Sequence, residues 1–147
     1  MKASVDDRKE RLEQARELPA FFPALGMTVE EIGEERVVVR MDVPDHFYTP
    51  YGAIHGGIVA AVIDTVGGMV VAMKLTPADR TATHSLNVSY TSFVRERSCI
   101  CIGRLLAMAR NTATVELEVV RDDGTLAAKA LGTYGIYRNK NRGAEEP

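Results

Sequence analysis

Residues 52–64 read GAIHGGIVAAVID, and this stretch decides the fold. Two adjacent glycines in it open a long apolar run that is interrupted by Asp64 and Thr65. Pro77 follows the run, and proline is common shortly after the end of a helix. We therefore predict a helix over residues 56–75. Because this helix is apolar on nearly all sides, the rest of the domain must enclose it.

The segments around this helix have the signals of β-strands. Residues 83–93 alternate between apolar and polar side chains, and the Asp-Gly pair at 123–124 is a hairpin signal. Short turns join the segments, which implies antiparallel neighbours. The predicted strands cover residues 27–32, 36–43, 83–93, 98–109, 112–121 and 126–137. The fold class is therefore α+β, with an antiparallel sheet wrapped around one long central helix.

The two ends of the chain differ from this middle part. Residues 5–18 are densely charged, and Asp6 and Asp7 near their start favour an extra N-terminal helix on the surface. A chain of 147 residues suits one main domain. We divide the chain into an N-terminal helix and loop (1–26), the main domain (27–138) and a flexible polar tail (139–147).

Charge and composition exclude several classes of protein. The formal net charge is -2 and the pI is about 5.9, whereas general nucleic-acid binders are usually basic. The N-terminal sequence MKASVDDRKERLEQ lacks the apolar run of a signal peptide. The central apolar run is shorter than the about 20 residues of a membrane span. We expect a cytoplasmic protein that binds neither nucleic acid nor membrane.

The two cysteines, Cys99 and Cys101, are two positions apart and would share one face of a strand. Such close neighbours rarely bond to each other, and the sequence has no further cysteine to complete a zinc site. We expect two small buried side chains and no metal.

Gly56 and Gly57 open the predicted helix, where backbone N–H groups lack partners and the helix dipole is positive. Without a Cβ, they let a substrate approach the backbone. A carbonyl placed there would be polarised as it becomes an oxyanion. The alternative is that the two glycines only make a tight turn into a crowded helix.

Asp64 lies among apolar residues, and Asp is almost never fully buried without a partner. The helix has no Lys or Arg before Lys74. Asp64 is therefore either a base or nucleophile in a polar cavity, which we favour, or a structural partner. Gly56 and Asp64 lie about 12 Å apart along a helix, so one carbonyl carbon cannot be near both. If both act on one substrate, they come from different chains.

The motif G-x-x-H-G-G at residues 52–57, with Asp64 nine residues after the His, resembles the hotdog-fold acyl-CoA thioesterases of the phenylacetic-acid-degradation type. Residues 83–90, THSLNVSY, also resemble the third strand of that family. The likeness covers about residues 29–137. It implies hydrolysis of an acyl-CoA at a subunit interface of a homodimer or homotetramer. It implies no cofactor, because coenzyme A is part of the substrate.

The resemblance also implies roles for single residues. Asp64 would be the base or the nucleophile, two routes that the sequence does not separate, and the Gly56 N–H would polarise the thioester. Thr83 matches a Ser/Thr that helps to hold the attacking water near the carboxylate. His55 would hydrogen-bond the loop and position the glycines. Thr49 stands where the family usually has the Asn that orients substrate or water.

The CoA end of the substrate carries phosphates, so basic groups should ring the entrance. Arg110 and Asn111 fall at a turn where the family commonly contacts the CoA nucleotide. Arg95 is a further candidate. Thr49, Tyr48 or Tyr51 could replace the missing Asn. Tyr51 and Gly57 complete the predicted substrate ligands.

The acyl end has a set of aromatic candidates. Phe47, Tyr48, Tyr51 and Phe93 could line an apolar pocket, which suits an aromatic or medium-chain acyl group. Two other functions stay open. One is a non-catalytic acyl-CoA binding or sensing protein, against which the retained Asp64 argues. The other is a hotdog enoyl-CoA hydratase or dehydratase, which typically uses a different His-plus-carboxylate arrangement.

Overall fold

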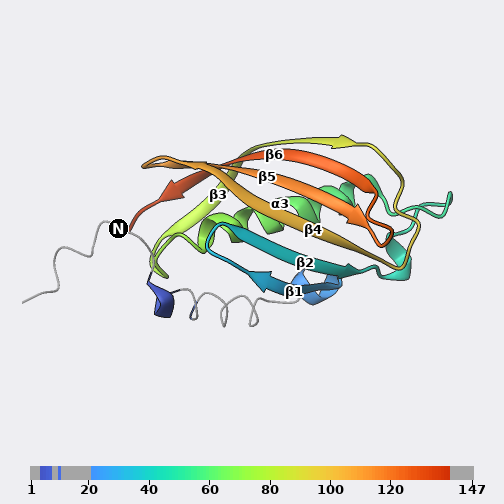
Figure 1. Ribbon diagram of the computed structural model, residues 1–147, viewed down its shortest axis with the longest axis horizontal. Coiled ribbons are helices and arrows are strands. Elements are labelled where there is room, and N and C mark those ends of the chain that lie inside the picture. The colour runs from blue at the N-terminus through green and yellow to red at the C-terminus, as the bar shows by residue number, and fades with distance from the viewer. Residues whose placement is uncertain (1–3, 8–9, 11–20, 140–147) are drawn as a thin grey trace, which may run out of the picture.

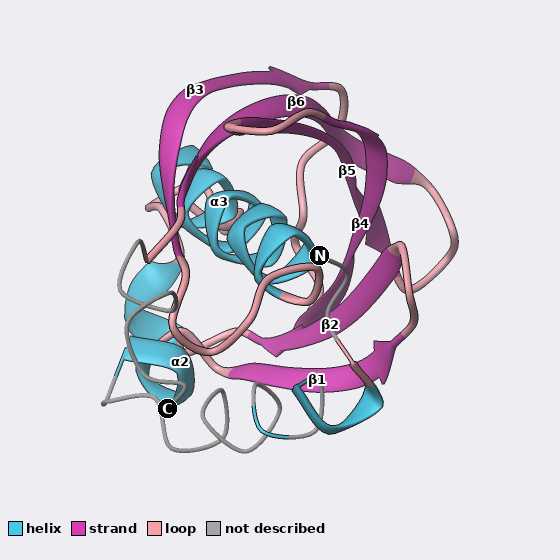
Figure 2. Cartoon of the chain, turned by 90° about the vertical axis from the view of Figure 1, so that its left-hand side faces the viewer, coloured by secondary structure: helices cyan, strands magenta, loops and turns pink. Residues whose placement is uncertain are grey.

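The computed structural model describes residues 4–7, 10 and 21–139. One long helix, α3 (Gly56–Ala72), lies in the hollow of a curved six-stranded antiparallel sheet (Figures 1 and 2). The strands are β1 (Met27–Ile32), β2 (Arg36–Asp42), β3 (Arg80–Tyr90), β4 (Ser98–Met108), β5 (Thr112–Arg121) and β6 (Leu126–Tyr137). Their order in the sheet is β1-β2-β4-β5-β6-β3. The predicted hotdog fold, a sheet wrapped around one central helix, is confirmed.

The core forms between α3 and the inner face of the sheet. Gly103 of β4 lies directly under the helix, where a Cβ would come within 2.8 Å of Val70 and 3.1 Å of Val66. A larger residue would push α3 away from the sheet. The fully buried side chains of the core include Val37, Val39, Met41, Ile63, Leu117 and Tyr134.

The central helix ends earlier than predicted, at Ala72 instead of about residue 75. The N–H groups of Lys74 and Leu75 bond to carbonyls three residues earlier, which tightens the chain into a turn. Asp79 then accepts hydrogen bonds from the N–H and the hydroxyl of Thr76. This turn connects the end of α3 to the start of β3.

The predicted strand 83–93 is shifted, since β3 starts at Arg80 and ends at Tyr90. The N–H groups of Thr91 and Ser92 both donate to the carbonyl of Ala127, and sharing one acceptor ends the regular ladder. The residues after Tyr90 therefore leave the sheet and run past the start of α3 (Figure 1).

The N-terminal part differs from the prediction where it is described. The expected loop before β1 contains a short helix, α2 (Phe21–Ala24), because Phe22 packs into the core. A single 3₁₀ turn, η1 (Asp45–Phe47), follows β2. Residues 5–7 and 10 are helical, and the other residues of the predicted helix 5–18 lie outside the described residues, as does the tail beyond residue 139.

The two cysteines are free and buried, as predicted. Burial raises the pKa of the Cys99 thiol to about 12 and also raises the pKa of the Cys101 thiol. In the part of the chain that the structure describes, no helix has the length and apolar character needed to cross a membrane.

Candidate active site

The start of α3 is fixed by the side chain of His55. This residue is the N-cap, with an extended backbone (φ -61°, ψ 131°), and its Nδ1 accepts the N–H of Gly57 at 2.9 Å. The carbonyl of His55 accepts the N–H groups of Ile58 and Val59. An N-cap that satisfies these donors stabilises the first turn. The predicted contact of His55 with the glycine segment is therefore present.

Gly56 keeps a free donor at this helix end. Its N–H makes no hydrogen bond with any residue that the structure describes, whereas the next three N–H groups of the helix all have acceptors. The positive end of the helix dipole adds to its attraction for a negative oxygen. Of the two predicted glycines, Gly56 is thus the available donor and Gly57 is engaged by His55.

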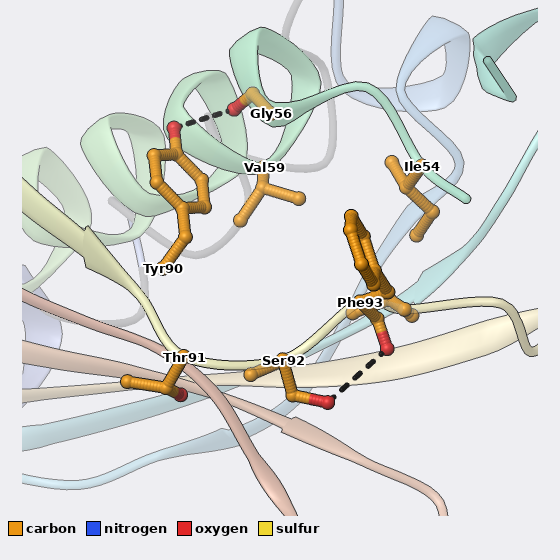
Figure 3. A pocket seen from close by; sticks show the side chains of 9 residues that line it. Ile54, Gly56, Val59, Tyr90, Thr91, Ser92 and Phe93 are labelled. Carbon is orange, nitrogen blue, oxygen red and sulfur yellow. Dashed lines mark hydrogen bonds between the residues drawn. The ribbon is translucent and has the colours of Figure 1, made fainter. Parts of the chain in front are cut away.

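A pocket of about 570 Å³ opens beside this donor. It lies between the start of α3 and the segment that leaves β3, as Figure 3 shows. Its walls come from the end of the loop before α3, the first turn of α3, the end of β3 with the segment that follows it, and β6. The lining residues are Ile54, Gly56, Val59, Tyr90, Thr91, Ser92, Phe93, Val94 and Ala127.

The hydroxyl groups in this lining are all engaged within the protein. Tyr90 donates to the carbonyl of Gly56 at 2.7 Å, and Thr91 donates to the carbonyl of Leu126 at 2.7 Å. The hydroxyl of Ser92 accepts a hydrogen bond from Arg121 at 3.1 Å. None of the described residues that line the pocket has a charged side chain. The cavity therefore offers a mainly apolar surface beside the backbone of Gly56.

Asp64 is half-buried on α3 and is held by Thr83 of β3. The Thr83 hydroxyl donates to Asp64 Oδ1 at 2.7 Å. No Lys or Arg among the described residues forms an ion pair with Asp64, so the structural cationic partner considered above is missing from this part of the chain. Thr83, which was expected to hold the attacking water near the carboxylate, thus lies in direct contact with Asp64.

A β-bulge aims Thr83 at this carboxylate. The register between β3 and β6 shifts between Thr83 and Ser85, so that Thr83 lies opposite Tyr134 and Ser85 lies opposite Thr133. Tyr134 faces the core and is fully buried. Directly opposite residues of a pair share a face, so Thr83 faces inward while Ser85 faces outward. Without the extra residue, His84, Thr83 would point away from the helix.

Tyr134 of β6 contacts the same segment of α3 from the inner face of the sheet. Its hydroxyl donates to the backbone carbonyl of Asp64 at 3.3 Å. Burial first, and then the nearby Asp64, raises the pKa of Tyr134 well above its ordinary value. This residue was not predicted, because an aromatic on a strand is most often simply core.

Three predicted residues, Tyr51, Phe93 and Arg95, lie together beside the pocket. The Arg95 guanidinium donates to the carbonyl of Tyr51 and lies 5.1 Å from the centre of the Phe93 ring. Thr49 closes the adjacent turn, with its N–H on the carbonyl of Ala53 at 2.7 Å. Its side chain makes no hydrogen bond with any described residue.

Other predicted residues are not brought together within one chain. Arg110 and Asn111 are exposed in the turn between β4 and β5, at the end of the sheet where α3 ends (Figure 1). Asp64 and Gly56 lie on one helix, about 12 Å apart at 1.5 Å per residue. Across residues 4–7, 10 and 21–139, no group of three or more His, Cys, Asp or Glu could hold a metal ion.

Residues 51–128, more than half of the chain, match the model of the thioesterase superfamily. The chain is 29% identical over 120 residues to a candidate esterase of Saccharolobus solfataricus, covering 82% of this chain and 85% of that protein. It is similar to a solved candidate thioesterase of Ralstonia eutropha JMP134, named as a phenylacetic acid degradation-related protein. That structure has a TM-score of 0.81 and 25% identity, over 88% of this chain and 98% of the other.

A solved thioesterase of Haemophilus influenzae shares the fold, with a TM-score of 0.81 and 19% identity over 90% of this chain and 92% of that chain. The match of the family model includes the start of α3, Asp64 and Thr83. The chain therefore belongs to the thioesterase superfamily and is a thioester hydrolase.

Proposed function

We propose that the protein hydrolyses an apolar acyl-CoA to the free acid and CoA. Water adds its oxygen to the thioester carbonyl carbon, the carbon–sulfur bond breaks, and CoA leaves as a thiolate that takes up a proton. The observation that carries this proposal is that Gly56, whose N–H has no acceptor among the described residues, lines the mainly apolar pocket at the positive end of α3.

Gly56 supplies the stabilisation that the reaction needs most. A thioester carbonyl gains negative charge as the nucleophile adds, and a preorganised backbone donor stabilises that charge more than the ground state. Because the Gly57 N–H is already bound to His55, we assign the oxyanion to Gly56.

Asp64 supplies the activation of the nucleophile. Thr83 holds one carboxylate oxygen, Oδ1, and leaves Oδ2 without a hydrogen bond to any described residue. That oxygen can take a proton from the water that attacks the carbonyl carbon. Alternatively, it can attack the carbonyl carbon itself, so that the carbon–sulfur bond breaks, CoA leaves as a thiolate, and water then hydrolyses the mixed anhydride to release the acid and restore Asp64. Thr83 would orient the carboxylate, and also the water if water attacks.

The site is proposed to form between two copies of the chain, in a homodimer or homotetramer. One chain separates Gly56 from Asp64, so the second group must come from a partner. β3 is an edge strand of 11 residues, and it is uncharged from Thr81 to Tyr90. Such a long unprotected edge invites pairing with a second copy. The side of α3 that carries Asp64 is also incompletely covered, with Ala61, Thr65 and Gly68 half-buried.

The acyl group is proposed to occupy the 570 Å³ pocket. Since the hydroxyl protons of Tyr90, Thr91 and Ser92 are engaged internally, a carboxylate on the acyl chain would find no free side-chain donor among the described lining residues. Aromatic or medium-chain acyl groups fit this surface. Arg95, beside the pocket, and Arg110 with Asn111, from either copy, are the proposed contacts for CoA.

A panel of matched acyl-CoAs tests this proposal by release of free thiol. Hexanoyl-CoA should be hydrolysed with a kcat/KM at least about tenfold above that of adipoyl-CoA. The pocket would desolvate the extra carboxylate of adipoyl-CoA without giving it a hydrogen-bond donor or a cation in return. Phenylacetyl-CoA should likewise exceed its para-hydroxy analogue. Thiol release from none of these, or a preference for the polar member of each pair, would contradict the proposal. An enoyl-CoA, followed by loss of the ultraviolet absorbance of its conjugated double bond instead of by thiol release, tests for water addition, the hydratase activity.

A further inference from the structure

We propose that Tyr90 is a positioning residue for the oxyanion donor, an inference that rests on the proposed function. Its hydroxyl, which Figure 3 shows on the carbonyl of Gly56, and the His55 imidazole hold the two ends of a single peptide group, the one between Gly56 and Gly57. Tyr90 donates to the carbonyl of that peptide at 2.7 Å, and His55 accepts its N–H at 2.9 Å. The N–H of Gly56 belongs to the preceding peptide group, whose His55 carbonyl accepts the N–H groups of Ile58 and Val59. Because the peptide groups on both sides of the Gly56 Cα are held, the direction of the Gly56 N–H is restricted.

Two consecutive glycines at a helix start make such a restraint necessary. Glycine has the greatest backbone freedom, and helix ends are the part of a helix that frays most readily. An oxyanion donor is effective only when it is held in place before the reaction. The His55 contact is local, because His55 precedes the glycines directly. The Tyr90 contact comes from the end of β3 and therefore ties the helix start to the sheet.

The ring of Tyr90 adds a second restraint. A Cβ built on Gly56 would lie 3.4 Å from Tyr90 Cζ, so the ring lies flush against the Gly56 backbone. Tyr90 nevertheless remains 53% exposed and lines the pocket. A residue that is half open to solvent contributes little to the core. Loss of its hydroxyl should therefore affect the reaction more than the stability.

The test is Tyr90→Phe, which keeps the ring and removes only the hydroxyl. With an acyl-CoA that the wild type hydrolyses, kcat should fall about tenfold, the worth of one well-placed hydrogen bond, while KM stays within about twofold. The control is Tyr137→Phe, which removes a hydroxyl bound to His84 Nε2 at 3.0 Å, on a residue that is 54% exposed and outside the pocket. It should leave kcat unchanged.

An infrared measurement separates positioning from loss of structure. Acyl-CoA labelled with ¹³C at the carbonyl is bound to Asp64→Asn protein, and its carbonyl stretch should lie at a lower frequency than in water. Adding Tyr90→Phe should reverse part of that shift without changing the melting temperature more than Tyr137→Phe does. An unchanged kcat, or a lower kcat with an unchanged carbonyl frequency, would overturn the inference alone. Absence of thiol release by the wild type would overturn the proposed function and this inference with it.

Discussion

Asp64→Asn is expected to lower kcat for acyl-CoA hydrolysis by about 10²–10⁴-fold, the usual cost of losing a general base. The amide has nearly the same shape, and its oxygen can still accept the Thr83 hydroxyl that now bonds to Oδ1. Because no cation in the described chain depends on Asp64, the change should leave the melting temperature and the binding of a non-hydrolysable acyl-CoA analogue nearly unaffected. Turnover, binding and thermal melting of the same variant check this.

Asp79→Asn is the matched control, since it makes the same chemical change at a structural carboxylate. Burial opposes the charge of Asp79, but hydrogen bonds from Thr76 and Asn139 and the charge of Arg138 outweigh it and lower its pKa. This variant should melt at a lower temperature and retain its kcat when folded. If Asp64→Asn behaves like Asp79→Asn, Asp64 is a structural partner and not the base or nucleophile.

Gly56→Pro should lower kcat by about 10²–10³-fold, because proline lacks the N–H that we assign to the oxyanion. The position suits proline otherwise. Gly56 is the first residue of α3, where proline is favoured, and the extended backbone of His55 (φ -61°, ψ 131°) is the conformation that proline requires before it. The variant should therefore fold, which circular dichroism and thermal melting can check.

Gly56→Ala separates the missing donor from the added bulk. Its Cβ would meet Tyr90 at 3.4 Å, an ordinary contact, and its N–H would remain. We expect Gly56→Ala to keep most of the activity that Gly56→Pro loses. Equal kcat values for the two variants would exclude the Gly56 N–H as the oxyanion donor.

Local sequence patterns were sufficient to predict most of the fold. The apolar run that begins at Gly56 predicted α3, and the turn signals gave β4, β5 and β6 within one residue of their bounds. Asp64 stood out because burying a carboxylate in an apolar helix is unfavourable unless the carboxylate has a partner or a functional role. These features depend on residues that are close in sequence, which is why they could be predicted.

The position of Thr83 could not be predicted from alternation. Leu86 and Val88 face inward, so a strict period of two puts Thr83 on the outer face with Ser85. The bulge at His84 reverses this, and it depends on pairing with β6, about 50 residues further along the chain. Only the family resemblance pointed to Thr83.

The sequence patterns also did not predict the pocket wall that the end of β3 and the following residues form. Alternation runs from Leu86 to Thr91 and breaks at Ser92, but the predicted strand was extended to the apolar Phe93. The strand ends at Tyr90 because Thr91 and Ser92 share the carbonyl of Ala127, a tertiary contact. The contact of Tyr90 with Gly56 likewise joins two distant segments, although its place at the end of the alternating strand was visible.

Complementation between two inactive chains tests the central claim most directly. Chains carrying Asp64→Asn and Gly56→Pro are co-expressed with different tags, and dimers that carry both tags are isolated. If each site takes Gly56 from one chain and Asp64 from the other, a mixed dimer has one intact site and one with both changes. It should then show about half of the wild-type kcat per dimer. If both groups act within one chain, every site carries one change, and activity no higher than that of the two inactive parents would contradict the account.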